Sequence, residues 1–200
     1  MARAARIAED SGADIIDINF GCPAKRVTNG YAGSALMRVP DLAQSLVEAV
    51  VGATSLPVTV KMRLGWDDDS LNAPDIARRA VDAGARMITV HGRTRQQFYK
   101  GEARCAPVRA VVEAVDVPVV VNGDITSPAR AREALEQSGA AAVMIGRGAQ
   151  GQPWIVGQIA AELAGQHQAA TPSGSELTAI VVEHYEGVLG EYGIAVGVRA

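Results

Sequence analysis

A single cysteine, Cys22, stands where an apolar stretch ends, in the phrase DINFGCPAKRVTNGYAGSALM at residues 17–37. About twenty glycine-rich residues follow it before the next helical pattern. Such long loops are uncommon in compact domains and tend to be functional, and a thiol placed there is partly exposed. Two roles stay open. A nucleophilic thiol needs a nearby base, which only a spatial neighbour such as His91 could supply; a general acid needs none, because an ordinary thiol is protonated at pH 7.

The second cysteine, Cys105 in EARCAPVRA, lacks a comparable setting, and we interpret it as a small apolar residue. Two distant cysteines without a CxxC motif or a Cys/His cluster predict neither a disulfide framework nor a metal site. We therefore expect no bound metal.

Polar residues gather near the ends of four apolar stretches. Since residues two apart on a strand face the same side, the following groups each share a face: Asp17 with Asn19; Thr59 with Lys61 and Arg63; Thr89 with His91 and Arg93; Asn122 with Asp124. Singly, Lys61 could pair with Asp17, and His91 could be a hydrogen-bonded core histidine. Four such groups in succession would be costly to bury without a ligand, so together they predict a ligand site. His167 and His184 lack this setting, and we expect them at the surface.

The phrase MIGRGAQGQPW, at residues 144–154, favours an anion site. Gly146 and Gly148 allow close backbone approach, Arg147 supplies a fork of donors, and Pro153 begins a helix whose free amides attract anions. With NGDITSP at 122–128, it resembles the phosphate site that barrels build from their last two βα loops. The alternative is two ordinary glycine turns.

The elements that must position these residues alternate along the chain. Strands are predicted at 14–20, 57–63, 86–91, 117–123 and 141–146, and helices near 41–52, 74–83, 106–115, 127–138 and 153–164. Gly12, Gly84 and Gly139 are expected to end helices in the left-handed conformation. Alternation predicts a parallel sheet covered by helices, either an open doubly wound sheet or a (β/α)8 barrel. Five units are few for a barrel, and the chain begins and stops within helical patterns, so we expect a fragment cut at both ends.

Composition bounds the function. The 200 residues are 48% hydrophobic and 4% aromatic, which is typical of one globular domain, and the net charge of −3 argues against strong electrostatic binding of nucleic acid by this segment alone. A local basic patch on the loops stays possible, drawn from Lys25, Arg26, Arg93, Arg95 and Lys100. No apolar run long enough for a membrane span and no signal peptide is found, so we expect a cytoplasmic protein without membrane contact.

Five phrases in one register make the chain recognisable: DINFGCPAKRVTNGYAGSALM, PVTVKMRLGW, ITVHGRTRQQFYKG, PVVVNGDI and VMIGRGAQGQPWI. The sequence resembles the tRNA-dihydrouridine synthases, and most of all their bacterial B-type branch, over about residues 1–165. The resemblance implies an α/β fold, a (β/α)8 barrel that binds FMN, of which residues 1–168 would supply strands four to eight. Residues 169–200 would begin a helical domain that holds tRNA. It also implies a monomer that uses NADPH to reduce the flavin.

The resemblance assigns roles to individual residues. The reaction reduces uridine in tRNA to 5,6-dihydrouridine, with hydride passing from FMN to C6 and a proton from Cys22 to C5, which favours the acid role. Lys61 and His91 would face the flavin ring, Asn122, Gly123 and Asp124 would line its ribityl and phosphate arm, and Gly146 and Arg147 would hold the phosphate. Asn19 would touch the uracil or support Cys22, and Arg93 would contact the substrate or the tRNA backbone.

The chain departs from complete members of the family. The first three strands, with an Ala-Pro-Met phrase and a Gln that meet the flavin, are absent, so part of the flavin site would be unmade and the isolated chain is expected to aggregate. Two rivals remain: an FMN barrel acting on a small molecule, such as a dihydroorotate dehydrogenase-like enzyme or an ene-reductase, and an inactive fragment. The position of the target uridine is not predicted.

Overall fold

The computed structural model describes residues 1–167 and 169–199. Its centre is a parallel sheet of five strands in the order β1-β2-β3-β4-β5. The strands are β1 Ile16–Phe20, β2 Val58–Arg63, β3 Met87–His91, β4 Val119–Asn122 and β5 Ala142–Met144. Each strand pairs with the next along the chain, without the reversal of order that marks a doubly wound sheet. The fold is α/β, with five successive strand units of a (β/α)8 barrel, and the barrel prediction is confirmed.

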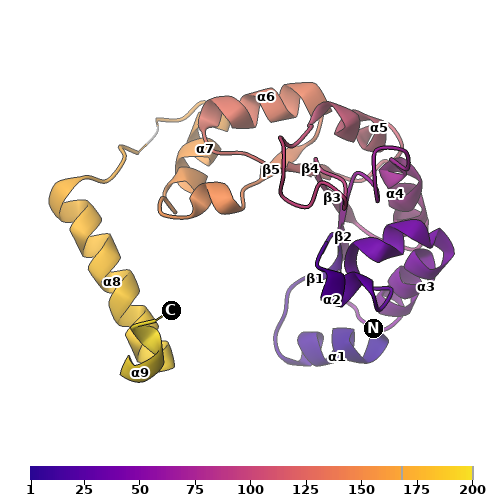
Figure 1. Ribbon diagram of the computed structural model, residues 1–200, viewed down its shortest axis with the longest axis horizontal. Helices are drawn as coiled ribbons and strands as arrows, with labels where there is room; N and C mark the ends of the chain where they lie inside the picture. Colours follow the sequence, from indigo (N-terminus) through magenta and orange to yellow (C-terminus); the bar gives the residue numbers. More distant parts are fainter. Residues whose placement is uncertain (168, 200) are drawn as a thin grey trace.

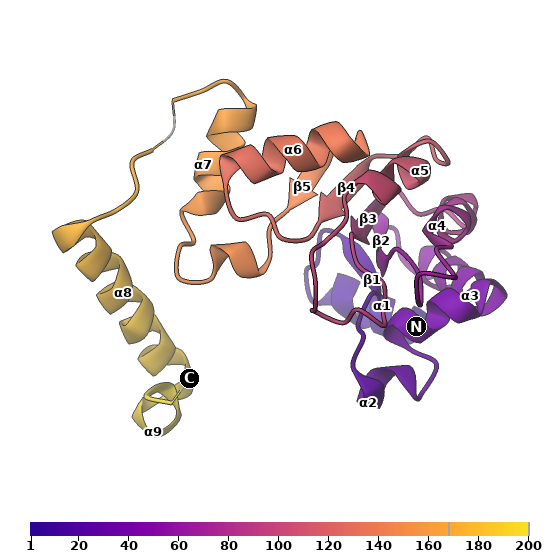
Figure 2. The same ribbon diagram turned by 45° about the horizontal axis from the view of Figure 1, so that its top comes forward.

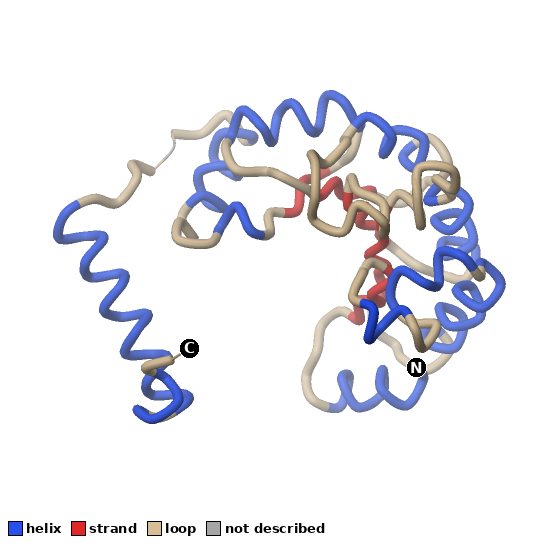
Figure 3. Tube along the Cα trace, in the orientation of Figure 1, coloured by secondary structure: helices blue, strands red, loops and turns tan. Residues whose placement is uncertain are grey.

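Within the described part of the chain, helices cover one face of this sheet. Figure 1 shows the chain bent into an arc, and Figure 3 shows the strands along the inside of the arc with helices around the outside. The covering helices are α1 Ala2–Asp10, α3 Pro40–Val51, α4 Ala73–Asp82, α5 Arg109–Val112, α6 Pro128–Ser138 and α7 Ile155–Leu163, with 3-10 turns at Ala106–Val108 and Arg147–Ala149. A predicted single helix at 106–115 is thus a 3-10 turn followed by the short α5.

The core lies between the outer face of the sheet and these helices. Val60, Ile88 and Val121 are fully buried there, and Ile18 is 2% exposed. β-branched and other large aliphatic residues suit such a covered strand surface. The other residues of each strand face the inside of the arc, as the period of two requires.

Helix ends follow the predicted signals. Ser127 caps α6, where its Oγ accepts a hydrogen bond from the Arg130 amide at 3.2 Å. The glycines after α1, α4 and α6 all have positive φ: 89° at Gly12, 103° at Gly84 and 69° at Gly139. These three predictions are confirmed.

The loop after β1 has more structure than the sequence predicted. It contains a short helix, α2 Lys25–Thr28, and a 3-10 helix, η1 Gly33–Arg38, of which residues 33–37 are buried. Gly33 has φ of 57°, and a Cβ there would stand 2.7 Å from the Cys22 carbonyl oxygen. The loop therefore folds back onto Cys22, and only glycine fits the point where it does so.

After α7 along the chain come α8 Gly174–Tyr192 and α9 Ile194–Gly197, which Figure 2 shows apart from the sheet. None of the described residues of α8 is buried. The predicted domain boundary at 168 and the chain end at 200 lie outside the described residues, so the division into 1–168 and 169–200 stays a prediction. No helix within the described part of the chain has the length and apolar character needed to cross a bilayer.

Candidate active site

One cavity of about 770 Å³ opens at the carboxyl ends of the strands, on the inner side of the arc. Its size is within the range of small-molecule sites. All ten residues predicted for the site line it: Asn19, Cys22, Lys61, His91, Arg93, Asn122, Gly123, Asp124, Gly146 and Arg147. The structure thus brings together residues that are far apart in the sequence, from position 19 to position 147. Their chemical roles stay predictions.

The backbone around Cys22 is fixed by hydrogen bonds on both sides. Asn19 Oδ1 accepts from the amides of Gly21 at 2.8 Å and Cys22 at 3.0 Å. The Cys22 carbonyl accepts from the Ser34 amide at 3.0 Å and from Ser34 Oγ at 2.9 Å. Asn19 therefore supports Cys22, one of its two predicted alternatives. The thiol itself lies on a half-buried residue that faces the cavity.

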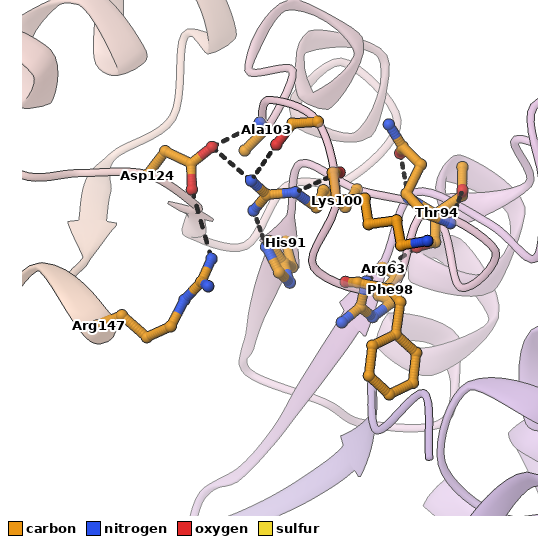
Figure 4. A network of polar contacts seen from close by, with 11 residues as sticks. Arg63, His91, Thr94, Phe98, Lys100, Ala103, Asp124 and Arg147 are labelled. Atoms are coloured by element: carbon orange, nitrogen blue, oxygen red, sulfur yellow. Dashed lines mark hydrogen bonds and ion pairs between the residues drawn. The ribbon is translucent and has the colours of Figure 1, made fainter. Parts of the chain in front are cut away.

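Arg63 ties the Cys22 loop to the loop after β3. Its side chain is 2% exposed, and its Nε donates to the Gly21 carbonyl at 2.8 Å. Its Nη1 donates to the carbonyls of Thr94 and Phe98, each at 2.8 Å. Figure 4 shows Arg63 next to Phe98, with Thr94 nearby. Three carbonyls from two loops thus converge on one buried cation.

Lys61 lies on the inner face, paired in register with Asn19 on β1 and Thr89 on β3. The simple alternative, an ion pair with Asp17, is not what the structure shows: Asp17 accepts from Thr59 Oγ1 at 2.7 Å. Within residues 1–167 and 169–199, no salt bridge or hydrogen bond engages the Lys61 ammonium. Burial and the positive charge of Arg63 lower the pKa of Lys61, and the charge of Asp17 opposes them. A half-buried ammonium without a partner suits an anionic ligand.

His91 is held as a neutral ring. Burial, together with the charges of Arg63, Lys61 and Arg93, lowers the pKa of His91 to about 3. An Arg93 guanidinium nitrogen lies 3.2 Å from His91 Nε2. Because a guanidinium has no acceptor, Nε2 must accept, and the neutral ring then carries its proton on Nδ1. His91 can therefore donate one hydrogen bond from Nδ1.

Arg93 and Asp124 form an ion pair in which Arg93 is buried and Asp124 is half-buried; Figure 4 shows the Asp124 carboxylate with the dashed lines to its partners. Arg93 is 2% exposed and donates to Asp124 Oδ2 at 2.6 Å, to the Gly101 carbonyl at 2.7 Å and to the Lys100 carbonyl at 3.3 Å. The Ala103 amide donates to the same carboxylate oxygen at 2.8 Å. Burial acts to raise the pKa of Asp124, but these hydrogen bonds and the nearby cations outweigh it, so the pKa is below its usual value. The N–H groups of Arg93 thus donate to other residues of this chain. The predicted contact of Arg93 with the substrate stays a prediction.

The two loops predicted to bind phosphate are pressed together. A Cβ on Gly148 would stand 2.1 Å from the Ile125 carbonyl oxygen, so only glycine lets the loop after β5 approach the loop after β4. A Cβ on Gly146 would meet nothing within 4 Å, which leaves its backbone open. The Arg147 guanidinium lies 3.7 Å from Asp124 Oδ1, toward which it points in Figure 4, and its 57% exposed side chain lines the cavity.

Several residues of the site were missed or underrated from the sequence. Arg63 was grouped with Lys61 by strand period but given no role, and Tyr99, which lines the cavity, was not singled out. The Tyr99 ring lies under two guanidinium groups, 5.6 Å from Arg63 and 5.2 Å from Arg147. The period of two signalled Arg63; nothing in the local sequence signalled Tyr99 or the buried Ser34.

The second cysteine and the other two histidines lie where the sequence predicts. Cys105 is 8% exposed within the core, and His167 and His184 are exposed, as predicted. Asn122 uses its side-chain amide to bond the Met144 carbonyl at 2.8 Å, which joins β4 to β5 beside the site.

Comparisons with known proteins identify the family of the chain. The whole chain, residues 1–200, matches the dihydrouridine synthase (Dus) family. The chain belongs to the dihydrouridine synthase family.

Relatives support the same assignment. A Rhodobacter capsulatus protein named "Probable tRNA-dihydrouridine synthase" is 62% identical over 199 residues, and a Rhizobium leguminosarum protein of the same name is 56% identical. A Xanthomonas axonopodis protein named "tRNA-dihydrouridine synthase B" is 49% identical. Each alignment covers 100% of this chain and 60–61% of the relative. The chain therefore spans about three fifths of the length of these relatives.

Solved structures share the fold at lower identity. A crystal structure of mandelate oxidase is 28% identical with a TM-score of 0.51, covering 74% of this chain and 47% of the other. A complex of mandelate oxidase with 3,3-difluoro-2-hydroxy-3-phenylpropionic acid is 26% identical with a TM-score of 0.52, covering 96% and 55%.

Proposed function

We propose that this chain forms the catalytic part of an FMN-dependent tRNA-dihydrouridine synthase, which reduces uridine to 5,6-dihydrouridine with NADPH as the reductant. The observation that carries the proposal is the convergence of ten residues of the family's phrases on one cavity, with Cys22 at one end and the Gly146-Arg147 loop at the other. The relatives named tRNA-dihydrouridine synthase support tRNA as the substrate.

The residues present fit FMN. An anionic phosphate suits the open backbone at Gly146 and the exposed guanidinium of Arg147. The ammonium of Lys61, which has no partner in the described chain, and the Nδ1 donor of neutral His91 suit an electron-rich ring that becomes anionic on reduction. Gly123 has φ of 127°, and a Cβ there would stand 2.5 Å from the Ala103 Cβ and 3.0 Å from the His91 ring, so only glycine fits between them. FMN, when bound, supplies the hydride that reduces C6 of the uracil.

Cys22 then acts as the general acid toward C5 of the uracil. Its position is set by Asn19 and Ser34 and not by a base, because no described residue forms a hydrogen bond with the thiol. This arrangement favours proton donation over nucleophilic attack, since a nucleophile would need a base in contact. A thiol fixed by its backbone can deliver its proton to one atom and one face of the base.

Two further groups hold the site in shape. Arg63 fixes the Gly21 carbonyl next to Cys22, so it orients the thiol through the backbone. Asp124 holds Arg93 on one side and faces Arg147 on the other. The target uridine has to leave its stack in folded tRNA to reach this cavity, as bases do in other base-modifying enzymes.

The test uses the protein expressed from its complete gene, with NADPH and unmodified tRNA. We expect a yellow protein and dihydrouridine in the tRNA, detected by mass spectrometry of its nucleosides. A flavin-loaded protein that oxidises NADPH and makes no dihydrouridine would contradict the proposal and favour an FMN barrel acting on a small molecule.

A further inference from the structure

Outside the cavity, two arginines stack on one tryptophan. The guanidinium carbon of Arg38 lies 4.8 Å from the centre of the Trp66 ring, and that of Arg95 lies 4.6 Å from it. We call Arg38, Trp66 and Arg95 the Trp66 stack. Its members come from three loops, those after β1, β2 and β3.

The stack leaves the hydrogen-bond donors of both arginines largely unused. A cation–π contact uses the face of a guanidinium, while its N–H groups point outward from the edge. In the described part of the chain, Arg38 makes no side-chain hydrogen bond or ion pair, and Arg95 makes one long contact, 3.5 Å from Nη2 to Thr28 Oγ1. Arg95 Nε is buried without any partner. By contrast, Arg79 and Arg104 are each paired with a carboxylate, at 2.9 and 2.5 Å.

The Trp66 stack stands on loops that also contribute residues to the cavity, while Arg38 and Trp66 themselves line a separate, neighbouring hollow. The Arg95 amide bonds the Gly65 carbonyl at 3.0 Å and the Gln96 amide bonds the Trp66 carbonyl at 2.9 Å, which fixes the two loops together. Tyr99 of the same loop lines the cavity. Thr28, on the other side of Arg95, ends α2, whose Lys25 and Arg26 are exposed and likewise unpaired among the described residues.

Three aspartates follow Trp66 but do not neutralise these cations. Asp68 pairs with Arg104 at 2.5 Å, and Asp67 accepts hydrogen bonds from Ser70 at 2.6 Å and Gln96 at 3.4 Å. Asp69 is exposed. No ion pair within residues 1–167 and 169–199 links any of them to Arg38 or Arg95. Among the described residues, Lys25, Arg26, Arg38 and Arg95 thus have no carboxylate in an ion pair, although Asp67 and Asp69 line the same hollow as Arg38.

We propose that the Trp66 stack, with Lys25 and Arg26, binds the sugar-phosphate backbone of the RNA substrate beside the target uridine. The inference rests on the proposed function, because it assumes that the cavity takes a base from RNA. Four cations spread over separate loops suit a polyanion better than one phosphate ion, and oriented guanidinium edges match phosphate oxygens in pairs. The indole holds both forks in place before RNA arrives, which lowers the entropy lost on binding.

The test compares charge and stacking separately. Arg38→Gln removes one fork, Trp66→Leu removes the stack but keeps every charge, and Arg86→Gln is the matched control. Arg86 is exposed and makes no described side-chain contact, but it stands at the amino end of β3, at the opposite rim. Binding of unmodified tRNA is measured against salt concentration for the protein expressed from its complete gene, with thermal melting to confirm that each variant is folded.

We expect Arg38→Gln to weaken binding about 5-fold and to reduce the slope of log K against log salt by about one unit, as the loss of one phosphate contact does. Trp66→Leu should weaken binding about 3-fold with the slope unchanged, because the charges remain. Arg86→Gln should change neither. If Arg38→Gln matches Arg86→Gln in affinity and slope, the proposed surface is wrong.

The outcome separates this inference from the proposed function. A protein that makes dihydrouridine while Arg38→Gln binds tRNA like the control refutes the surface alone. A protein that binds tRNA with the expected slopes but forms no dihydrouridine refutes the function and keeps the surface. A protein that binds no tRNA overturns both.

Discussion

The outer and inner faces of the sheet are built from alternate residues of the same five strands, yet they differ in almost every property. On the outer face Val60, Ile88 and Val121 are fully buried and purely apolar. On the inner face Lys61 and His91 are half-buried and charged or polar, and they line the cavity. Successive residues of a strand therefore alternate between the core, where they stabilise the fold, and the cavity, where they are available for chemistry. Substitutions on the two faces should have effects of different kinds.

The largest effect is expected for Cys22→Ala. Loss of the general acid should slow dihydrouridine formation about 10³-fold, within the range for such groups, while the flavin stays bound because the thiol is not among the residues that would hold it. Steady-state rates and the flavin absorbance of the purified variant check this. Cys105→Ala, a change of the same size in the core, serves as the control and should leave the rate unaltered. A Cys22→Ala enzyme with normal turnover would refute the role of the thiol.

On the outer face, Ile88→Ala should act on stability instead. Emptying a fully buried position between β3 and the helices costs about 3 kcal/mol in the free energy of unfolding. Urea unfolding of the protein expressed from its complete gene measures it. The rate of the remaining folded enzyme should stay close to that of the parent. A loss below about 1 kcal/mol would mean that this face is less tightly packed than the structure shows.

Much of this division could be predicted from the sequence, because it depends on local rules. The period of two put Lys61 and His91 on one face, and the glycines after helices adopt the positive φ expected. The loop after Cys22 was misjudged, because η1 is held by distant contacts such as Ser34 with Cys22. The bonds from Arg63 to the loops at Gly21 and Phe98 span 42 and 35 residues, and no local pattern reveals such pairs.

Two arginines of the site should also differ in kind: Arg93 should matter for stability, as the outer face does, and Arg147 for ligand binding, as the inner face does. Arg93→Met should lower the unfolding free energy by about 2 kcal/mol, because Asp124 and the carbonyls of Gly101 and Lys100 lose a buried donor. Arg147→Met should change the melting temperature of the flavin-free protein little, because its ion pair with Asp124 is long and its side chain is 57% exposed, and should weaken FMN binding about 10-fold. Thermal melting and fluorescence titration with FMN measure the two effects. If Arg147→Met lowered stability and Arg93→Met weakened only FMN binding, the roles assigned to the two arginines would be wrong.

A last prediction concerns the pH dependence of stability that His91 imposes. Its folded pKa of about 3 lies below the ordinary value of 6.5, so between these values the unfolded chain binds a proton that the folded chain does not. The free energy of unfolding should therefore fall as the pH is lowered from 6.5 toward 3. His91→Asn should flatten the dependence in that window. NMR signals of the His91 ring that titrate between pH 6 and 7 would contradict this assignment.

Whether a fixed thiol in this cavity delivers the proton to uridine is tested most directly by reducing tRNA in D₂O and locating the deuterium by NMR of the isolated dihydrouridine. Because Cys22 is held by Asn19 and Ser34, the wild-type protein should place deuterium on one face of C5 only. The residual product of Cys22→Ala should carry deuterium on both faces. Deuterium on both faces of C5 in the wild-type product would show that free solvent supplies the proton and would contradict the role assigned to Cys22.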